Sequence, residues 1–277
     1  MLLLNFKNII YQLFIIPLLL LITSCSSVPT TKMSHQQSGE ISYYFRPGNG
    51  PTIVFQSGLG DNKSVWSDVL HALPLTTPVF AYDRPGYGDS PGVNGARDAC
   101  TISEELHNLL KSEKIPPPYV IVGHSLGGLY AYCFAERYPF EVSGLVLIDP
   151  THPKHWQQMQ TLAPIQSTLI KILRVTSFSR AARQEFDGQE TCLENLENKA
   201  PLNTPTKLLF SGKFSFLEKG AFESMIRELR AQWAQKFIDS SQQEVTTSGH
   251  YIQNETPEIV AQSIQKLVEK ENRKPVK

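Results

Sequence analysis

The chain has 277 residues, of which 41% are hydrophobic and 19% are charged, a balance typical of a globular protein with one large core. Its 26 lysines and arginines are matched by 26 aspartates and glutamates. A chain without net charge has no overall field that would attract a nucleic acid or an acidic polymer, so nucleic-acid binding is not expected.

The first 25 residues, MLLLNFKNIIYQLFIIPLLLLITSC, have the pattern of a targeting sequence, with an early Lys7, an apolar run and small residues before Cys25. The closing ITSC resembles a bacterial lipobox, which implies a signal peptide over residues 1–24 and a lipid on Cys25. The alternatives are a plain secretory signal or an uncleaved anchor helix, although 13–22 is short for a full span. By the same resemblance, Ser26 favours the outer membrane. We therefore expect a protein of the bacterial cell envelope that faces the periplasm.

Residues 25–39 continue with a polar sequence that has no periodicity. Such a sequence predicts a flexible tether between the lipid and a folded domain over 40–277.

Three further cysteines are Cys100, Cys133 and Cys192. Exported chains meet an oxidising compartment, which allows a disulfide between Cys100 and Cys192, although no spacing demands one. Cys133 falls on the presumed inner face of a helix and is expected to be a small buried hydrophobic residue. With no CxxC pair and no paired-histidine spacing, no metal site is predicted.

From Glu40 onward, short apolar runs alternate with amphipathic segments. The runs predict strands at 41–45, 51–58, 77–84, 119–125, 143–150, 206–212 and 243–250. Helices are predicted near 63–73, 101–114, 126–138, 219–238 and 256–271, the second of them opened by a capping box from Thr101 to Glu104. This order predicts an α/β fold, with a mainly parallel sheet and helices on both of its faces.

About fifty-five residues separate the strand that ends at Asp149 from the strand that begins near Thr206, much more than an ordinary crossover contains. The excess predicts a helical lid over about 151–204 that covers one end of the sheet. Its apolar residues are either the underside of the lid, facing acyl groups, or ordinary helix packing: Trp156, Met159, Leu162, Leu169, Ile172 and Leu173.

The stretch VIVGHSLGG, residues 120–128, has the strand, tight turn and helix pattern of a nucleophile elbow centred on Ser125. A side chain on Gly123 or Gly127 would collide with neighbouring elements, which explains the small residues. The Ser125 hydroxyl would project into a cleft, where the helix that begins near Leu126 would direct its N–H groups. The plainer interpretation is a strand-to-helix turn that happens to contain a serine.

Through GHSLGG, YDRPGYG and a late SGH, the chain resembles the α/β-hydrolase superfamily, specifically its small serine hydrolases. The likeness covers about residues 40–271 and implies the α/β-hydrolase fold. In this fold 143–150 corresponds to the sixth strand and 206–212 to the seventh, and the lid is inserted after the sixth. It also implies a small acyl substrate and no metal or organic cofactor. In such proteins a loop like SGLGD supplies a second oxyanion N–H, so Leu59 would join Leu126, with Ser57 in the place of the usual histidine.

A serine hydroxyl needs a base that takes its proton, and His250 is the candidate, because the resemblance places the catalytic histidine on a loop before the last helix. In much of the superfamily the acid follows the seventh strand, where this chain has Lys213 and, further on, Glu218. We expect the acid to be Asp149, at the end of the sixth strand as in some relatives, with Glu218 as the alternative. Asp149 could otherwise be a turn former before Pro150.

The segment DRPGYG, residues 83–88, has two interpretations. It could form a wall of the cleft, or it could be a fixed turn in which Asp83 and Arg84 hydrogen-bond the backbone of a loop. We favour the second.

These features predict a serine hydrolase that cleaves a carboxylic ester, or a related acyl compound, through Ser125, His250 and Asp149 and an acyl-enzyme. A dehalogenase or an epoxide hydrolase would need an aspartate at the elbow. An acyltransferase or a cofactor-free haloperoxidase-like enzyme would use the same three residues. A non-catalytic binding protein of the envelope is the remaining alternative, suggested by the missing acid after 206–212.

Overall fold

The computed structural model describes residues 31–37, 39–92, 95–193 and 199–273. The predicted signal peptide, 1–24, and the predicted lipidation site, Cys25, lie outside these residues. None of the helices within the described ranges is both long enough and apolar enough to cross a bilayer.

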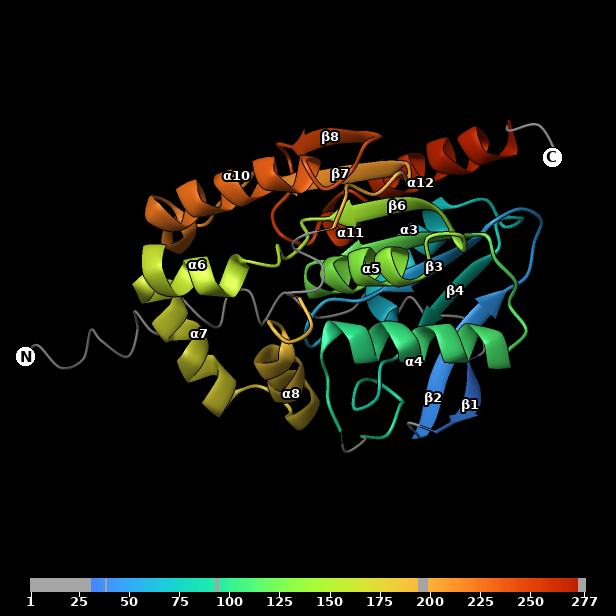
Figure 1. The fold of residues 1–277 in the computed structure, drawn as a ribbon, viewed down its shortest axis with the longest axis horizontal. Coiled ribbons are helices and arrows are strands. Elements are labelled where there is room, and N and C mark those ends of the chain that lie inside the picture. Colours follow the sequence, from blue (N-terminus) through green and yellow to red (C-terminus); the bar gives the residue numbers. More distant parts are fainter. Residues whose placement is uncertain (1–30, 38, 93–94, 194–198, 274–277) are drawn as a thin grey trace, which may run out of the picture.

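The described strands form one eight-stranded sheet in the order β1-β2-β4-β3-β5-β6-β7-β8 (Figure 1). The strands are β1 (Lys32–Gln36), β2 (Gly39–Arg46), β3 (Thr52–Gln56), β4 (Val79–Tyr82), β5 (Tyr119–His124), β6 (Val142–Ile148), β7 (Thr206–Ser211) and β8 (Ser240–Val245). Pairing is antiparallel from β1 to β2 and from β2 to β4, and parallel across the rest of the sheet. The predicted mainly parallel sheet is confirmed.

Helices connect most of these strands. They are η1 (Lys63–Trp66), α3 (Ser67–Ala72), α4 (Ala99–Ser112), α5 (Leu126–Arg137), α6 (His155–Leu162), α7 (Pro164–Thr176), α8 (Arg180–Gly188), η2 (Phe216–Glu218), α10 (Ala221–Ala234), α11 (Ile252–Glu255) and α12 (Pro257–Asn272).

The sheet separates two hydrophobic clusters. In β5, Ile121 belongs to the cluster that contains the apolar sides of α4 and α5, whereas Val120 and Val122 belong to the cluster with α3 and α12. Side chains alternate between the two faces of a strand, and both faces are covered here, so all three residues are fully buried. Covered faces explain why the central strands are almost continuously apolar.

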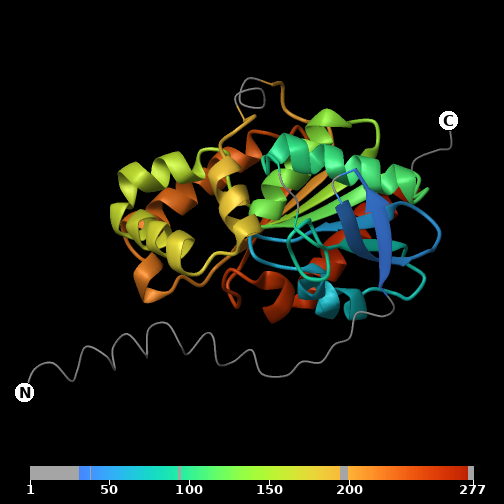
Figure 2. The ribbon, with the colours of Figure 1, turned by 90° about the horizontal axis from the view of Figure 1, so that it is seen from below.

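The lid consists of α6, α7 and α8, which lie between β6 and β7 in the sequence, as predicted for about 151–204. Figures 1 and 2 show these three helices together at one end of the sheet, the end toward which β6 points. The lid therefore lies over the carboxyl ends of the parallel strands, where open sheets of this kind bind their ligands.

Two sequence predictions are wrong. The tether predicted for 25–39 includes β1, which pairs residue by residue with β2 from Lys32 opposite Tyr43 to Gln36 opposite Gly39. An edge strand is held by backbone hydrogen bonds and needs no apolar pattern, so composition did not reveal it. The cap of α4 is also misplaced: Asp98 accepts hydrogen bonds from the N–H groups of Cys100 (2.9 Å) and Thr101 (3.1 Å), and the helix begins at Ala99.

A disulfide joins Cys100, in α4, to Cys192, just after α8, with a Cα–Cα distance of 6.1 Å. It therefore fixes the end of the lid to a helix of the main domain. Cys133 is fully buried in α5, as predicted, and its sulfur lies within 4.8 Å of the other two. Within the described ranges this cysteine group is the one cluster of potential metal ligands, and two of its members are bonded to each other.

The double substitution Cys100→Ala and Cys192→Ala should lower the free energy of unfolding by about 2–4 kcal/mol, because the bridge restricts a long loop of the unfolded chain. Urea unfolding with and without a reductant measures this. Reduction should destabilise the wild-type protein and the Cys133→Ala control, but should leave the double variant unchanged. A wild-type midpoint that does not respond to the reductant would contradict the bridge.

Candidate active site

Ser125 lies at the turn between β5 and α5, with φ 53° and ψ −121°. A residue with a side chain is strained at positive φ and keeps it only where its surroundings fix the backbone. Here the Ser125 N–H donates to the carbonyl oxygen of Ile148 (3.0 Å), while its own carbonyl accepts from the N–H groups of Gly128 and Thr151 (2.9 Å each). These bonds attach the turn to β6 and to the first residues after it.

The glycines around Ser125 allow close backbone contacts. A Cβ atom on Gly123 would lie 2.5 Å from the carbonyl oxygen of Gly127. A Cβ atom on Gly127 would lie 2.3 Å from the carbonyl oxygen of Gln56. Real Cβ atoms essentially never approach so closely, so any other residue would push α5 away from β3 and β5. The collision predicted from the sequence is confirmed.

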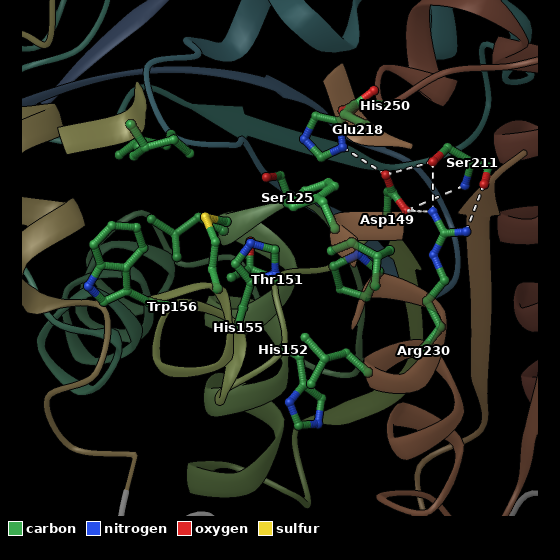
Figure 3. A pocket seen from close by; sticks show the side chains of 18 of the residues that line it. Ser125, Asp149, Thr151, His152, His155, Trp156, Ser211, Glu218, Arg230 and His250 are labelled. Atoms are coloured by element: carbon green, nitrogen blue, oxygen red, sulfur yellow. Dashed lines mark hydrogen bonds and ion pairs between the residues drawn. The ribbon is translucent and has the colours of Figure 1, made fainter. Parts of the chain in front are cut away.

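His250 and Asp149 meet at the rim of the sheet (Figure 3). Asp149 follows β6 directly, with φ 42°, and His250 lies on the loop between β8 and α11. The Nδ1 atom of His250 is 2.7 Å from Oδ2 of Asp149. Both side chains line the cavity that contains Ser125, and Figure 3 shows the imidazole and the Ser125 hydroxyl facing the same space.

Two residues that the sequence did not suggest hold Asp149 in place. Ser211, the last residue of β7, donates from Oγ to Asp149 Oδ2 (3.0 Å), and Arg230, on α10, donates to Oδ1 (2.8 Å). Arg230 also donates to the carbonyl oxygen of Ser211 (2.8 Å). Ser211 lies next to the end of the predicted strand 206–212 and could have been suspected, whereas nothing in the pattern of α10 distinguishes Arg230 from a surface arginine.

Electrostatics keep Asp149 ionised and favour the protonated form of His250. Burial raises the pKa of Asp149, but the hydrogen bond and charge of His250, together with Arg230 and Ser211, outweigh it and hold this pKa well below its usual range. Burial alone would lower the pKa of His250. The hydrogen bond and charge of Asp149 reverse this, so the pKa of His250 is raised.

Glu218, the alternative acid, has another role in the structure. Its carboxylate accepts from the N–H of Ser215 (2.7 Å), in a capping box that begins η2. It lines the cavity and its charge adds to the raised pKa of His250, but the hydrogen bond of His250 Nδ1 goes to Asp149.

The cavity has a volume of about 260 Å³ and lies between the strand ends, the lid and α10. Its lining is largely apolar and includes Trp156, Met159, Ile170, Phe186, Phe222 and Ile226. The apolar stripe predicted for the lid divides: Trp156 and Met159 face the cavity, whereas Leu162 and Ile172 are 46% and 53% exposed. The interpretation as the underside of the lid therefore holds for Trp156 and Met159, whereas the exposed Leu162 and Ile172 fit neither interpretation.

Three other histidines lie near the site, and two of them, His152 and His155, line the cavity. The buried His124 donates from Nε2 to the carbonyl oxygen of His250 (3.0 Å) and so supports the loop that carries His250. His155, on α6, lines the cavity, and burial together with the charge of His250 lowers its pKa to about 4. His155 is therefore neutral at neutral pH.

The two predicted oxyanion donors, Leu59 and Leu126, both line the cavity. Leu126 is the first residue of α5, and Leu59 lies on the loop after β3. That loop is bound by Arg84, which donates to the carbonyl oxygens of Ser57 (2.6 Å) and Gly58 (2.7 Å). The interpretation of 83–88 as a segment that hydrogen-bonds a loop backbone is confirmed for Arg84 and for Asp83, whose carboxylate accepts from the N–H groups of Lys63 (2.7 Å) and Asp89 (2.9 Å).

The substitution Asp149→Asn should lower the pKa of His250, because burial remains while the main hydrogen bond to a charged partner is lost. A titration of the imidazole by NMR measures this pKa. The matched variant Glu218→Gln removes a weaker contribution and should lower the pKa less. A larger fall in Glu218→Gln than in Asp149→Asn would mean that Glu218 is the carboxylate that controls His250.

Comparisons with known proteins bear on the fold of the chain. A family model described as "alpha/beta hydrolase fold" matches residues 51–171. The chain is 27% identical over 226 residues to YqjL, an uncharacterized protein of Bacillus subtilis, across 76% of this chain and 81% of the relative. It is 32% identical over 123 residues to an esterase of Mycobacterium tuberculosis, but this match covers only 44% of the chain and 41% of the esterase.

Solved structures give the same result over a longer stretch. A thermophilic esterase from Thermogutta terrifontis superposes with a TM-score of 0.62 at 19% sequence identity, over 87% of this chain and 98% of the esterase. At that identity the likeness concerns the fold alone. The chain therefore has the α/β-hydrolase fold.

Proposed function

We propose that the protein is a serine hydrolase that cleaves a carboxylic ester, or a related acyl compound, through Ser125, His250 and Asp149. The observation that carries this proposal is the 2.7 Å contact between His250 Nδ1 and Asp149 Oδ2, beside a cavity that also contains Ser125 at a strained turn. The three groups suit the roles of nucleophile, base and orienting acid.

The geometry suggests how the groups act. Asp149 holds the Nδ1–H of His250, which leaves Nε2 to take the proton from the Ser125 hydroxyl as the oxygen attacks the substrate carbonyl. The negative oxygen then accepts hydrogen bonds from the N–H group of Leu59 and from that of Leu126, which lies at the positive end of α5. His250 returns the proton to the leaving alcohol. His250 next takes a proton from a water molecule, which attacks the acyl carbon. The Ser125 oxygen leaves and receives the proton from His250, and the carboxylic acid is released.

Ester substrates are favoured by the cavity and by the relatives. The apolar lining from α6, α7, α8 and α10 suits an acyl chain, and the relative from Mycobacterium tuberculosis is an esterase. The alternative of a non-catalytic envelope protein loses its motivation, since the carboxylate missing after β7 is supplied from the end of β6 by Asp149.

A fluorophosphonate probe, which reacts with activated serines, should label the full-length protein, and chromogenic esters of increasing acyl length should be hydrolysed. Ser125→Ala should abolish labelling and lower kcat by about 10⁶-fold, and Asp149→Asn should lower kcat by about 10⁴-fold. Ser215→Ala, which alters the capping box of Glu218, serves as the control and should remain labelled. Folded wild-type protein that is neither labelled nor active would refute the proposal.

We further propose that the protein is anchored to the bacterial outer membrane by a lipid on Cys25 and faces the periplasm. The ITSC sequence supports this, and β1 begins only a few residues later, at Lys32. Even a fully extended chain of that length reaches about 25 Å, so the domain would lie close to the membrane.

Cells that express the protein and receive a radiolabelled fatty acid should incorporate the label. Cys25→Ala should lose the label and keep residues 1–24, which the mass of the purified protein reveals. Ser26→Ala should still carry the lipid. An unlabelled wild-type protein would rule out the anchor while leaving the hydrolase proposal intact.

A further inference from the structure

A pair of buried opposite charges connects the lid to the loop that carries Leu59. Arg84 follows β4 in the main domain, and Glu185 belongs to α8 in the lid. Their side chains are 2% and 0% exposed. Charged groups are rarely buried so completely unless each satisfies the other, so the contact requires α8 to be docked.

Glu185 holds the guanidinium from the lid side. Arg84 donates from Nε to Oε1 (2.8 Å) and from an Nη atom to Oε2 (2.9 Å), a two-point contact that fixes the plane of the guanidinium. The hydroxyl of Tyr87 also donates to Oε2 of Glu185 (3.1 Å). The orientation of Arg84 is thus set by a residue of the lid.

The other side of the same guanidinium holds the loop. Its two terminal nitrogens donate to the carbonyl oxygens of Ser57 and Gly58, at 2.6 and 2.7 Å. The Gly58 carbonyl and the Leu59 N–H belong to one planar trans peptide group, in which C=O and N–H point in opposite directions. Arg84, by fixing the carbonyl, therefore also fixes the direction of the Leu59 N–H, on the side away from Arg84.

The contact also affects the strength of this donor. The positive guanidinium, hydrogen-bonded to the carbonyl oxygen, polarises the peptide group and makes its N–H a better hydrogen-bond donor. Leu59 lines the cavity beside Ser125, which is where a reacting carbonyl would place its negative oxygen.

We infer that Arg84 and Glu185 are positioning residues through which the docked lid helix α8 orients the Leu59 N–H for the oxyanion. This inference rests on the proposed hydrolase function. The lid does more than line the cavity: with α8 displaced, Arg84 loses its counter-charge and the loop loses its fixed orientation. The oxyanion site is then complete only in the closed protein.

Arg84→Lys and Glu185→Gln test the link in the full-length protein. The single ammonium group of a lysine at position 84 cannot bind two loop carbonyls and the Glu185 carboxylate in one plane. A glutamine at position 185 has no negative charge to compensate Arg84. Both variants should lower kcat about 10- to 100-fold, less than the loss of a whole oxyanion donor, with KM within about 3-fold. Binding of a trifluoromethyl ketone, whose adduct with Ser125 carries the oxyanion, should weaken by the same factor as kcat. Glu185→Asp keeps the charge and should recover part of the loss.

Arg97→Lys is the matched control. Arg97 is 1% exposed and belongs to the same charged cluster, where it pairs with Glu105 at 2.6 Å and lies 3.5 Å from Glu185. Arg97 donates hydrogen bonds to Glu105 and Glu185, whereas Arg84 binds the loop carbonyls. Its variant should lose thermal stability, as the other two variants do, but should keep kcat and inhibitor affinity within about 3-fold.

The outcomes separate the two proposals. If Arg84→Lys and Glu185→Gln lose stability but keep kcat and inhibitor affinity, the link is only structural and the inference is wrong. The inference is also wrong if Arg97→Lys weakens the inhibitor as much as they do. If the wild-type protein neither hydrolyses esters nor binds the ketone, the hydrolase proposal has failed first.

Discussion

The hydrogen bond between His250 and Asp149 is the contact on which the arrangement of the cavity depends. It joins two residues that are 101 positions apart and brings the loop after β8 to the end of β6. The bond needs an ionised carboxylate on a side chain that is only 12% exposed, and Arg230 from α10 and Ser211 from β7 stabilise that charge. Four elements thus converge on one carboxylate, and His250 is aimed at the cavity as a consequence.

A second pair of compensating charges lies behind the loop of Leu59. There a buried glutamate of the lid, Glu185, and a buried arginine of the main domain, Arg84, compensate each other, and the arginine uses its remaining donors on the loop of Leu59. With the disulfide from Cys192 to α4, the lid is attached to the main domain at two places close together in the sequence. A lid attached in this way is part of the framework of the cavity as well as a cover.

Local pattern was enough wherever a local cause operates. The elbow at Ser125 was predicted because close backbone approach requires glycines at fixed positions beside it, and the central strands because burial on both faces requires continuous apolar runs. Prediction failed where the cause is not local. The strand β1 is held by backbone pairing with β2, so its polar sequence looked like a tether, and the cap at Asp98 competed with an equally plausible Thr101.

The sequence by itself determined the order of strands and helices from β2 onward, the position of the elbow, the approximate extent of the lid and a short set of candidate residues, because each of these follows from periodicity or from steric demands on neighbouring residues. It left open which carboxylate meets His250, and it gave no reason to single out Arg230 or Glu185. Only the tertiary structure decided these points. The choice between Asp149 and Glu218 depends on which strand ends lie side by side and on where buried charges find partners, and both are properties of the assembled sheet and lid.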